Sequence, residues 1–265
     1  MLQRNYGWKR SLPDWRDLKM SAPTPEDINK LPPKADLREW VPEIYNQGTT
    51  SSCTANSLTN VTRIINKKQG YPDVPPSRLF HYYNERLVEG TVNVDGGAQI
   101  RTAVSVAAKY GICPESEWPF DPSKILNRPP ETAYKSAVQD MVKIYFGIDQ
   151  RLNDFKKCLA NGFPFLLGFA VYESFEGDDI AHTGIMKFPD PNERMIGGHA
   201  VAAVGYDDAT QTFTILNSWS KNWGDAGYFH MPYSFLTNPG FCSDFWTIRS
   251  MEVPGDTTRK WVVPT

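Results

Sequence analysis

The chain has 265 residues, of which 40% are apolar and 13% aromatic, and its formal net charge is −2. This length and composition can fill a sizeable core, and they predict one large domain or two lobes around a shared cleft. The small net charge gives no electrostatic reason to expect nucleic acid or an anionic membrane as a partner. The longest apolar run, Phe163–Tyr172, is too short to span a bilayer and predicts a buried strand.

Residues 1–35 predict an extended N-terminal arm. They are rich in proline and charge, and their aromatic side chains (Tyr6, Trp8, Trp15) are scattered rather than periodic. The start lacks the apolar stretch of a secretory signal. We therefore expect a monomer that is cytoplasmic as synthesised, or present in a virion or host cell if it is viral, with export by another route left open.

Residues 36–136 predict a helical lobe. Apolar residues recur at helical spacing between Cys53 and Ile65, and Gly70 marks the expected end of that helix. A second helix is predicted over residues 98–111, where a glycine closes the pattern.

Residues 137–255 predict a strand-rich lobe, and residues 256–265 a C-terminal tail. Segments in this part either alternate between apolar and polar residues or are apolar throughout, and turn residues separate them. A helical lobe followed by a strand-rich lobe is an α+β arrangement. The predicted strands cover residues 141–146, 164–171, 199–207, 212–219 and 227–232.

Cys53 stands where a small polar run ends and a helix begins. Unpaired amide N–H groups and the dipole at a helix N-terminus stabilise an anion, so this thiol is expected to ionise more readily than usual. Ser51 and Ser52 are good capping residues for the same helix. The other cysteines form no CxxC pair and are interpreted as small buried hydrophobic residues: Cys113, Cys158 and Cys242.

A thiolate needs a base, and the chain has four histidines. His199 enters an apolar strand directly after two glycines, a position that can face a cleft. Further along, Asn217 can accept the imidazole N–H and fix the ring, and Trp219 can shield that bond from water. The other histidines lie in an aromatic helical stretch, an acidic loop and a strand end: His81, His182 and His230.

An acidic cluster, Glu176, Asp178 and Asp179, raises the alternative of a metal site. Carboxylates alone at irregular spacing define no coordination geometry, so the cluster is interpreted as a solvated loop. We expect no metal and no cofactor.

Four motifs, taken in order, resemble the papain family of cysteine peptidases over roughly Asp36 to Thr247. They are "NQGTTSSC", "DGGAQIRTAVSVAAKYGI", "GGHAVAAVGYD" and "NSWSKNWGDAGYFHM". "SCTAN" and the leading "YGWKRSLPDWRD" resemble the compact bacterial and viral branch that includes xylellain. The resemblance implies a two-lobe fold, with a helical left lobe, a β-barrel-like right lobe and the active-site cleft between them.

The resemblance also implies roles for the matching residues. Cys53 matches the nucleophile, His199 the general base and acid, and Asn217 the residue that orients the histidine. Gln47 matches the side-chain oxyanion donor, with the Cys53 backbone N–H as the second donor. Further positions match residues that bind an extended substrate, line a roomy pocket for a bulky apolar or aromatic side chain, or shield the site: Gly96, Gly97, Gly168, Ala200 and Trp219.

The sequence departs from the family pattern at several positions. The family usually bridges a cysteine three residues before the nucleophile to one just before the glycine pair. Here these positions hold Thr50 and either Asp95 or Val94, which fits a reducing compartment. The residue after the nucleophile is Thr54 rather than tryptophan, and Gly198 precedes the histidine.

The sequence therefore predicts a papain-like cysteine endopeptidase that acts on polypeptide substrates, made as a zymogen or a self-covered enzyme. The N-terminal arm is predicted to be a short propeptide that covers the cleft as an intramolecular inhibitor, with a stabilising surface strap as the alternative. Two other functions stay open at this point. One is a non-catalytic binding protein on a peptidase scaffold, and the other is a cell-wall amidase with Cys/His chemistry.

Overall fold

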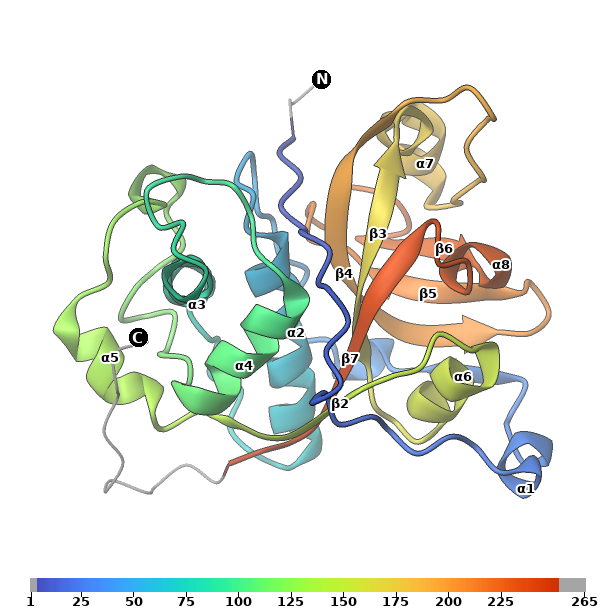
Figure 1. Cartoon of the computed structure of the whole chain (residues 1–265), viewed down its shortest axis with the longest axis horizontal. Helices are drawn as coiled ribbons and strands as arrows, with labels where there is room; N and C mark the ends of the chain where they lie inside the picture. Colours follow the sequence, from blue (N-terminus) through green and yellow to red (C-terminus); the bar gives the residue numbers. More distant parts are fainter. Residues whose placement is uncertain (1–3, 253–265) are drawn as a thin grey trace.

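The computed structural model describes residues 4–252. The α-helices are α1 (Pro25–Asn29), α2 (Cys53–Lys68), α3 (Arg78–Val88), α4 (Ile100–Lys109), α5 (Glu131–Ala137), α6 (Leu152–Ala160), α7 (Asp178–Thr183) and α8 (Tyr233–Leu236). Short 3-10 helices are η1 (Arg38–Trp40), η2 (Pro122–Lys124) and η3 (Glu173–Glu176). Helices α2 to α5 gather on one side of the molecule, and the strands lie on the other side together with α1, α6, α7 and α8 (Figure 1).

Within the described residues, a seven-stranded antiparallel sheet forms the second half of the molecule. Its order is β2-β7-β3-β4-β5-β6, and β1 pairs with β4 outside that path. The sheet is barrel-like without being a closed barrel. The strands are β1 (Lys34–Asp36), β2 (Val142–Gly147), β3 (Phe165–Tyr172), β4 (Met195–Asp207), β5 (Thr212–Leu216), β6 (Tyr228–Pro232) and β7 (Cys242–Met251).

Helix α2 is the element that joins the two halves. Residues from Cys53 to Asn66 are all buried, because α2 packs against α3 and α4 on one side and against β4 and β7 on the other. Apolar residues of both halves accordingly form one continuous core. The helix N-terminus and the middle of β4 are thereby brought together, which decides where the cysteine meets the histidine strand.

The structure confirms the α+β class and most of the predicted elements. The helix predicted to begin at Cys53 does so, and α4 ends just before Gly111. Strand β4 begins four residues earlier than predicted, at Met195, because it pairs with the end of β3. Strand β5 ends at Leu216, so the predicted strand residues 217–219 lie in the following loop instead.

The proposed domain limits stay predictions, although two of them fall inside elements. The limit at residues 35 and 36 cuts β1, and the limit at residues 136 and 137 cuts α5. The predicted tail at residues 256–265 lies outside the described residues. No helix within residues 4–252 is long and apolar enough to cross a bilayer.

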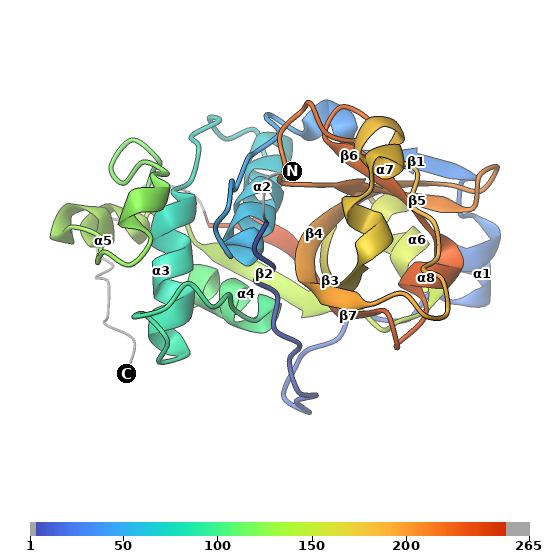
Figure 2. The same cartoon turned by 90° about the horizontal axis from the view of Figure 1, so that it is seen from above.

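The first segment of the described chain runs between the helical half and the sheet. In Figures 1 and 2 it passes from the N-terminus between α2 and α4 on one side and β4 and β7 on the other. Only after this passage does the chain turn away, form α1 and enter the sheet as β1.

Candidate active site

Cys53 is the first residue of α2, and its side chain is fully buried. Ser52 is the N-cap residue, but its side chain makes no capping hydrogen bond, contrary to the prediction. The Ser52 hydroxyl is instead bonded to Thr50 and accepts a bond from the Asn56 amide, and Ser51 turns toward Asp95. The loop that precedes Cys53 is thus held by bonds among its own side chains and to the loop around Asp95.

His199 lies in the middle of β4 and contacts both predicted partners. Its Nε2 is 2.9 Å from Asn217 Oδ1, and its ring stacks on Trp219 with centroids 5.0 Å apart. Because Asn217 Oδ1 can only accept, Nε2 carries the proton and Nδ1 keeps its lone pair. Within the described residues, Nδ1 is buried and has no hydrogen-bond partner, so it is free to take up a proton.

Gln47 lies beneath the nucleophile loop and is held at both ends of its amide. Its Nε2 donates to the Thr50 carbonyl at 2.8 Å, and its Oε1 accepts from Ser218 Oγ at 2.6 Å. The second Nε2 hydrogen takes part in neither of these bonds and can donate a hydrogen bond to an oxyanion. The Ser218 contact also ties Gln47 to the loop that carries Asn217.

Burial shifts the pKa values of both Cys53 and His199, and that of the thiol moves in the direction opposite to the one predicted. Burial raises the pKa of the Cys53 thiol to about 12, against backbone hydrogen bonds that include those of Ala200 and Gly7, which lower it. Burial also lowers the pKa of His199 to about 4, although its bond to Asn217 raises it. The loss of solvation by water raises the thiol pKa more than the helix N-terminus lowers it. With the arm in place, the Cys53 thiol and the His199 imidazole are both neutral.

The N-terminal arm lies over the candidate active site. Its backbone forms hydrogen bonds to the residue that follows Gly96 and Gly97 and to strand β4. Ala98 N donates to Gly7 O at 2.8 Å, and Lys9 N donates to Ala98 O at 3.0 Å. On the other side, Trp8 N donates to Gly198 O at 2.9 Å. The pairing residue on the helical side is therefore Ala98, while Gly97 allows the close approach: a Cβ there would lie 1.9 Å from Gly7 O.

Arm side chains fill the space on both sides of Cys53. The Trp8 indole lies against Gly168 and Gly198, where an added Cβ would come within 1.9 Å and 2.6 Å of the ring. The indole N–H donates to Asp244 Oδ2 at 2.9 Å, and Ser11 N donates to the same oxygen at 2.9 Å. Nothing in the sequence indicated a role for Asp244, because only the fold brings its carboxylate to the arm.

Toward the other end of the cleft, Tyr6 lies edge-on to His199 and Trp219, with ring centroids 6.3 Å and 6.4 Å away. The Arg4 guanidinium lies 4.1 Å above the Trp219 ring. Glu176 forms an ion pair with Arg4 and accepts a hydrogen bond from the Tyr6 hydroxyl. The interpretation of Glu176 as part of a solvated acidic loop is therefore wrong: it holds the arm.

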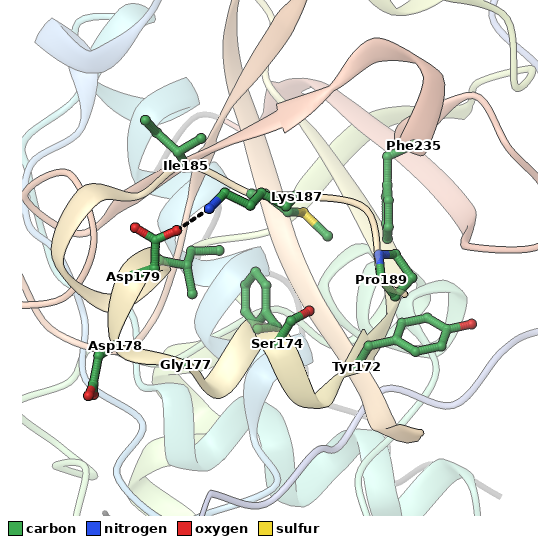
Figure 3. A pocket seen from close by; sticks show the side chains of 12 residues that line it. Tyr172, Ser174, Gly177, Asp178, Asp179, Ile185, Lys187, Pro189 and Phe235 are labelled. Atoms are coloured by element: carbon green, nitrogen blue, oxygen red, sulfur yellow. Dashed lines mark hydrogen bonds and ion pairs between the residues drawn. The ribbon is translucent and has the colours of Figure 1, made fainter. Parts of the chain in front are cut away.

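The remaining members of that acidic cluster, Asp178 and Asp179, begin helix α7. Within residues 4–252 no group of three or more His, Cys, Asp or Glu side chains could hold a metal ion. Asp179 forms an ion pair with Lys187 at the edge of a cavity of about 310 Å³ (Figure 3). Neither Cys53 nor His199 lines this cavity, so it is separate from the candidate active site.

A second buried polar group lies behind the nucleophile and was also missed by sequence reasoning. Thr54 donates to Glu85 Oε2 at 2.5 Å, and Glu85 Oε1 is 3.2 Å from His81 Nε2. Both Glu85 and His81 are fully buried, and burial raises the pKa of Glu85. Thr54 stands where the family usually has tryptophan, and its small hydroxyl makes room for this contact.

The family model of papain family cysteine proteases matches residues 31–241. The chain belongs to this family, and it is a cysteine peptidase, which confirms the predicted family and enzyme class. It is 40% identical over 277 residues to an uncharacterized peptidase C1-like protein of Acanthamoeba polyphaga mimivirus, covering 96% of this chain and 89% of that protein.

Solved structures agree with this assignment. The crystal structure of xylellain, a cysteine protease from Xylella fastidiosa, has a TM-score of 0.86 and 39% identity, covering 94% of this chain and 97% of that chain. ProCathepsin B S9 from Trypanosoma congolense has a TM-score of 0.70 at 19% identity, covering 95% of this chain and 87% of that chain. The latter likeness shows the shared fold.

The position of Gln47 leads to a first prediction. Replacing Gln47 by alanine removes the side-chain amide predicted to be an oxyanion donor, so we expect kcat to fall by roughly 10- to 1,000-fold with little change in KM. The measurement is steady-state hydrolysis of a peptide substrate, expressed per active site titrated with an irreversible inhibitor. Ser218→Ala, which removes only the bond to Gln47 Oε1, is the milder control. An unchanged kcat in Gln47→Ala would exclude the oxyanion role.

Proposed function

We propose that this protein is an endopeptidase that hydrolyses peptide bonds through Cys53, His199 and Asn217. The observation that supports it most is the bond from His199 Nε2 to Asn217 Oδ1, which leaves Nδ1 free as a base. The Cys53 thiol gives its proton to Nδ1, and the thiolate attacks the carbonyl carbon of the substrate.

The negative oxygen that forms is held by the Gln47 side-chain amide and the Cys53 backbone N–H. The imidazolium of His199 then protonates the leaving amine as the C–N bond breaks, and an acyl-enzyme remains. Water, deprotonated by the same imidazole, attacks the thioester and releases the acid product. Asn217 keeps the ring in the orientation that both transfers need.

We further propose that the arm inhibits the enzyme while it lies in the cleft. Gly7 is next to the thiol, and Trp8 and Tyr6 occupy the two neighbouring sides, so a substrate has no access. The same covering removes water from Cys53 and His199 and holds both neutral. Inhibition in this state thus has a steric and an electrostatic part.

The side chain of Trp8 supports the predicted substrate preference. Gly168 and Ala200 stay the proposed lining of the pocket for the residue second from the scissile bond on the acyl side. Trp8 lies against Gly168, which shows how much room a glycine leaves there. A pocket that accepts the indole ring of Trp8 has room for a bulky apolar or aromatic side chain of a substrate.

Labelling with an epoxide inhibitor of cysteine peptidases tests this proposal. We expect adduct formation at Cys53, located by mass spectrometry, slowly in the full chain and faster in a form that starts near Leu31. If the shorter form remains folded and no adduct forms at Cys53, the non-catalytic scaffold is favoured. If both forms label and turn over equally per titrated site, the arm is a surface strap and does not inhibit.

The shifted pKa of His199 predicts that acid releases the arm. In the covered state the pKa is about 4, against about 6.5 for an imidazole in water. The uncovered state therefore binds more protons on His199, and the covered state loses stability as the pH falls from about 6.5 through 4. We expect the uncovered fraction to rise by about 10- to 100-fold over this range.

Hydrogen exchange of the Trp8 and Lys9 amides, corrected for intrinsic rates, measures this release. Asp244 also faces the arm, and burial raises its pKa, so its protonation favours the covered state and acts in the opposite sense. Glu176 faces Arg4 and Tyr6 from the other side. His199→Gln separates these contributions: it should abolish the acid-dependent gain in exchange, and retention of the full gain would rule out His199 as its source.

A further inference from the structure

The loop before the nucleophile and the loop of the glycine pair are joined by a carboxylate. Ser51 N donates to both carboxylate oxygens of Asp95 at 3.1 Å, and Ser51 Oγ donates to the Asp95 backbone carbonyl at 2.9 Å. All four cysteines are free, and the family resemblance places the bridged cysteines at Thr50 and at either Asp95 or Val94. A non-covalent contact between Ser51 and Asp95 therefore lies beside the place where a covalent one is usual.

A buried tyrosine of α3 completes the contact. Tyr82 Oη donates to Asp95 Oδ1 at 2.7 Å and accepts from Gly97 N at 2.9 Å. Its hydroxyl thereby connects the carboxylate to the glycine loop, and the ring itself is fully buried. Burial and the neighbouring Asp95 both raise the pKa of Tyr82, so the hydroxyl keeps the proton that this bond requires.

An arginine on the next turn of α3 holds the same loop from below. Arg86 is fully buried, and its guanidinium donates to the carbonyls of Val92 and Val94 and to Ile125 O. It also lies 4.1 Å from the Tyr82 ring. A buried positive charge beside the Asp95 loop favours a carboxylate there over a neutral side chain.

The two joined loops form opposite walls around the place nearest the thiol. Gly7 of the arm lies between them: a Cβ on Gly7 would be 1.7 Å from Ser51 O, and a Cβ on Gly97 would be 1.9 Å from Gly7 O. A backbone hydrogen bond from Gly7 reaches Cys53. The separation of Ser51 and Gly97 therefore sets the space in which a chain can lie beside the nucleophile.

We infer that Asp95 and Tyr82 are positioning residues that fix the width of the substrate cleft, a clamp made of hydrogen bonds in place of a disulfide. The inference rests on the proposed function, because it concerns the binding of substrate beside Cys53. A chain that pairs with Ala98 passes between the clamped walls, whereas a minimal substrate that reaches only the thiol does not. The clamp thus acts on the binding of extended polypeptides and leaves the chemical step unchanged. Unlike a disulfide, it keeps its strength in a reducing compartment.

The test compares two variants of the full chain, Tyr82→Phe and Asp95→Asn, on two substrates. One substrate is a peptide with several residues on the acyl side, and the other is an ester of a single blocked amino acid. For each variant we expect KM for the peptide to rise about tenfold, the cost of losing one or two buried hydrogen bonds, with kcat within about threefold. Neither constant for the ester should worsen, because the ester does not pass between the clamped walls.

Tyr233→Phe is the matched control, since Tyr233 Oη donates to Asp208 Oδ1 at 2.8 Å in the other half of the molecule. It should lower the thermal midpoint as Tyr82→Phe does, yet leave KM for the peptide unchanged. A fall in thermal midpoint without a change in peptide KM in either Asp95→Asn or Tyr82→Phe would reduce the clamp to a structural contact and overturn the inference.

Rates are expressed per thiol titrated with an epoxide inhibitor, so oxidised sites are not counted. Labelling of Cys53 in the unchanged chain is established first. Failure to label both the unchanged chain and a folded form that starts near Leu31 contradicts the proposed function itself, and the positioning role falls with it. Labelling followed by equal peptide KM values in all four proteins contradicts only the clamp.

Discussion

Cys53→Ala is expected to abolish peptide hydrolysis, with kcat/KM at least ~1,000-fold below that of the unchanged chain. Alanine offers no atom that can attack a carbonyl carbon, so the covalent route is lost and only binding and oxyanion contacts remain. His199→Ala should give a loss of the same order, because it removes the group proposed to take up the thiol proton and to protonate the leaving amine. Since the two residues act as one unit, the double variant should be no worse than either single one.

The fold must survive these substitutions for the result to be informative. Cys53 is a small side chain at the start of α2, and its truncation leaves a small void. Circular dichroism and the thermal midpoint of Cys53→Ala should therefore stay close to those of the unchanged chain. Cys113→Ala, which changes a buried thiol elsewhere in the helical half, is the matched control and should keep full activity. Appreciable turnover by Cys53→Ala would refute the mechanism.

Gly7→Ala uncovers the active site without touching any residue proposed to act on substrate. The added methyl group would lie 1.7 Å from the carbonyl oxygen of Ser51 and 2.5 Å from its carbon. Both atoms belong to backbone that hydrogen bonds to Asp95 hold in place, so neither side can yield cheaply. Overpacking of this kind costs about 1–3 kcal/mol, which corresponds to a labelling rate of Cys53 raised on the order of 10- to 100-fold.

The control for this variant is another residue of the same arm. Trp15 is 93% exposed, so Trp15→Ala removes a large side chain from the arm without changing the contacts that the arm makes in the cleft. Trp8→Ala, by contrast, empties the space beside Gly168 and leaves Asp244 without the indole donor, and should accelerate labelling as Gly7→Ala does. A labelling rate in Gly7→Ala equal to that in Trp15→Ala would show that Gly7 does not keep the site closed.

Autoinhibition and the clamp rely on the same narrow space. Gly7 fits beside the thiol because Ser51 and Gly97 are held on either side of it, and both are held through Asp95 and Tyr82. Weakening the clamp should therefore loosen the arm as well as an extended substrate. Tyr82→Phe is then expected to label faster than the unchanged chain while it binds peptide more weakly, a combination that loss of the arm alone does not produce.

The sequence alone determined the parts of this protein that depend on local pattern. The helix beginning at Cys53, most of the strands and the order of four motifs could all be read from spacing. These features survive because hydrophobic periodicity and short motifs are properties of neighbouring residues. The family, the α+β class and the nature of the enzyme followed from them and are confirmed by the comparisons.

Only the tertiary structure decided what residues far apart in the chain do to one another. A helix N-terminus predicts an acidic thiol, but the arm excludes water from Cys53, and the loss of solvation outweighs the dipole. Glu176 and Asp244 looked like ordinary acidic residues until the fold laid the arm across them. Asp95 is one of the two positions that the resemblance gives for a missing cysteine, and nothing in its sequence context indicated a bond to Ser51. Burial and long-range contact set the charge state and partners of each of these groups, and neither is encoded in local spacing.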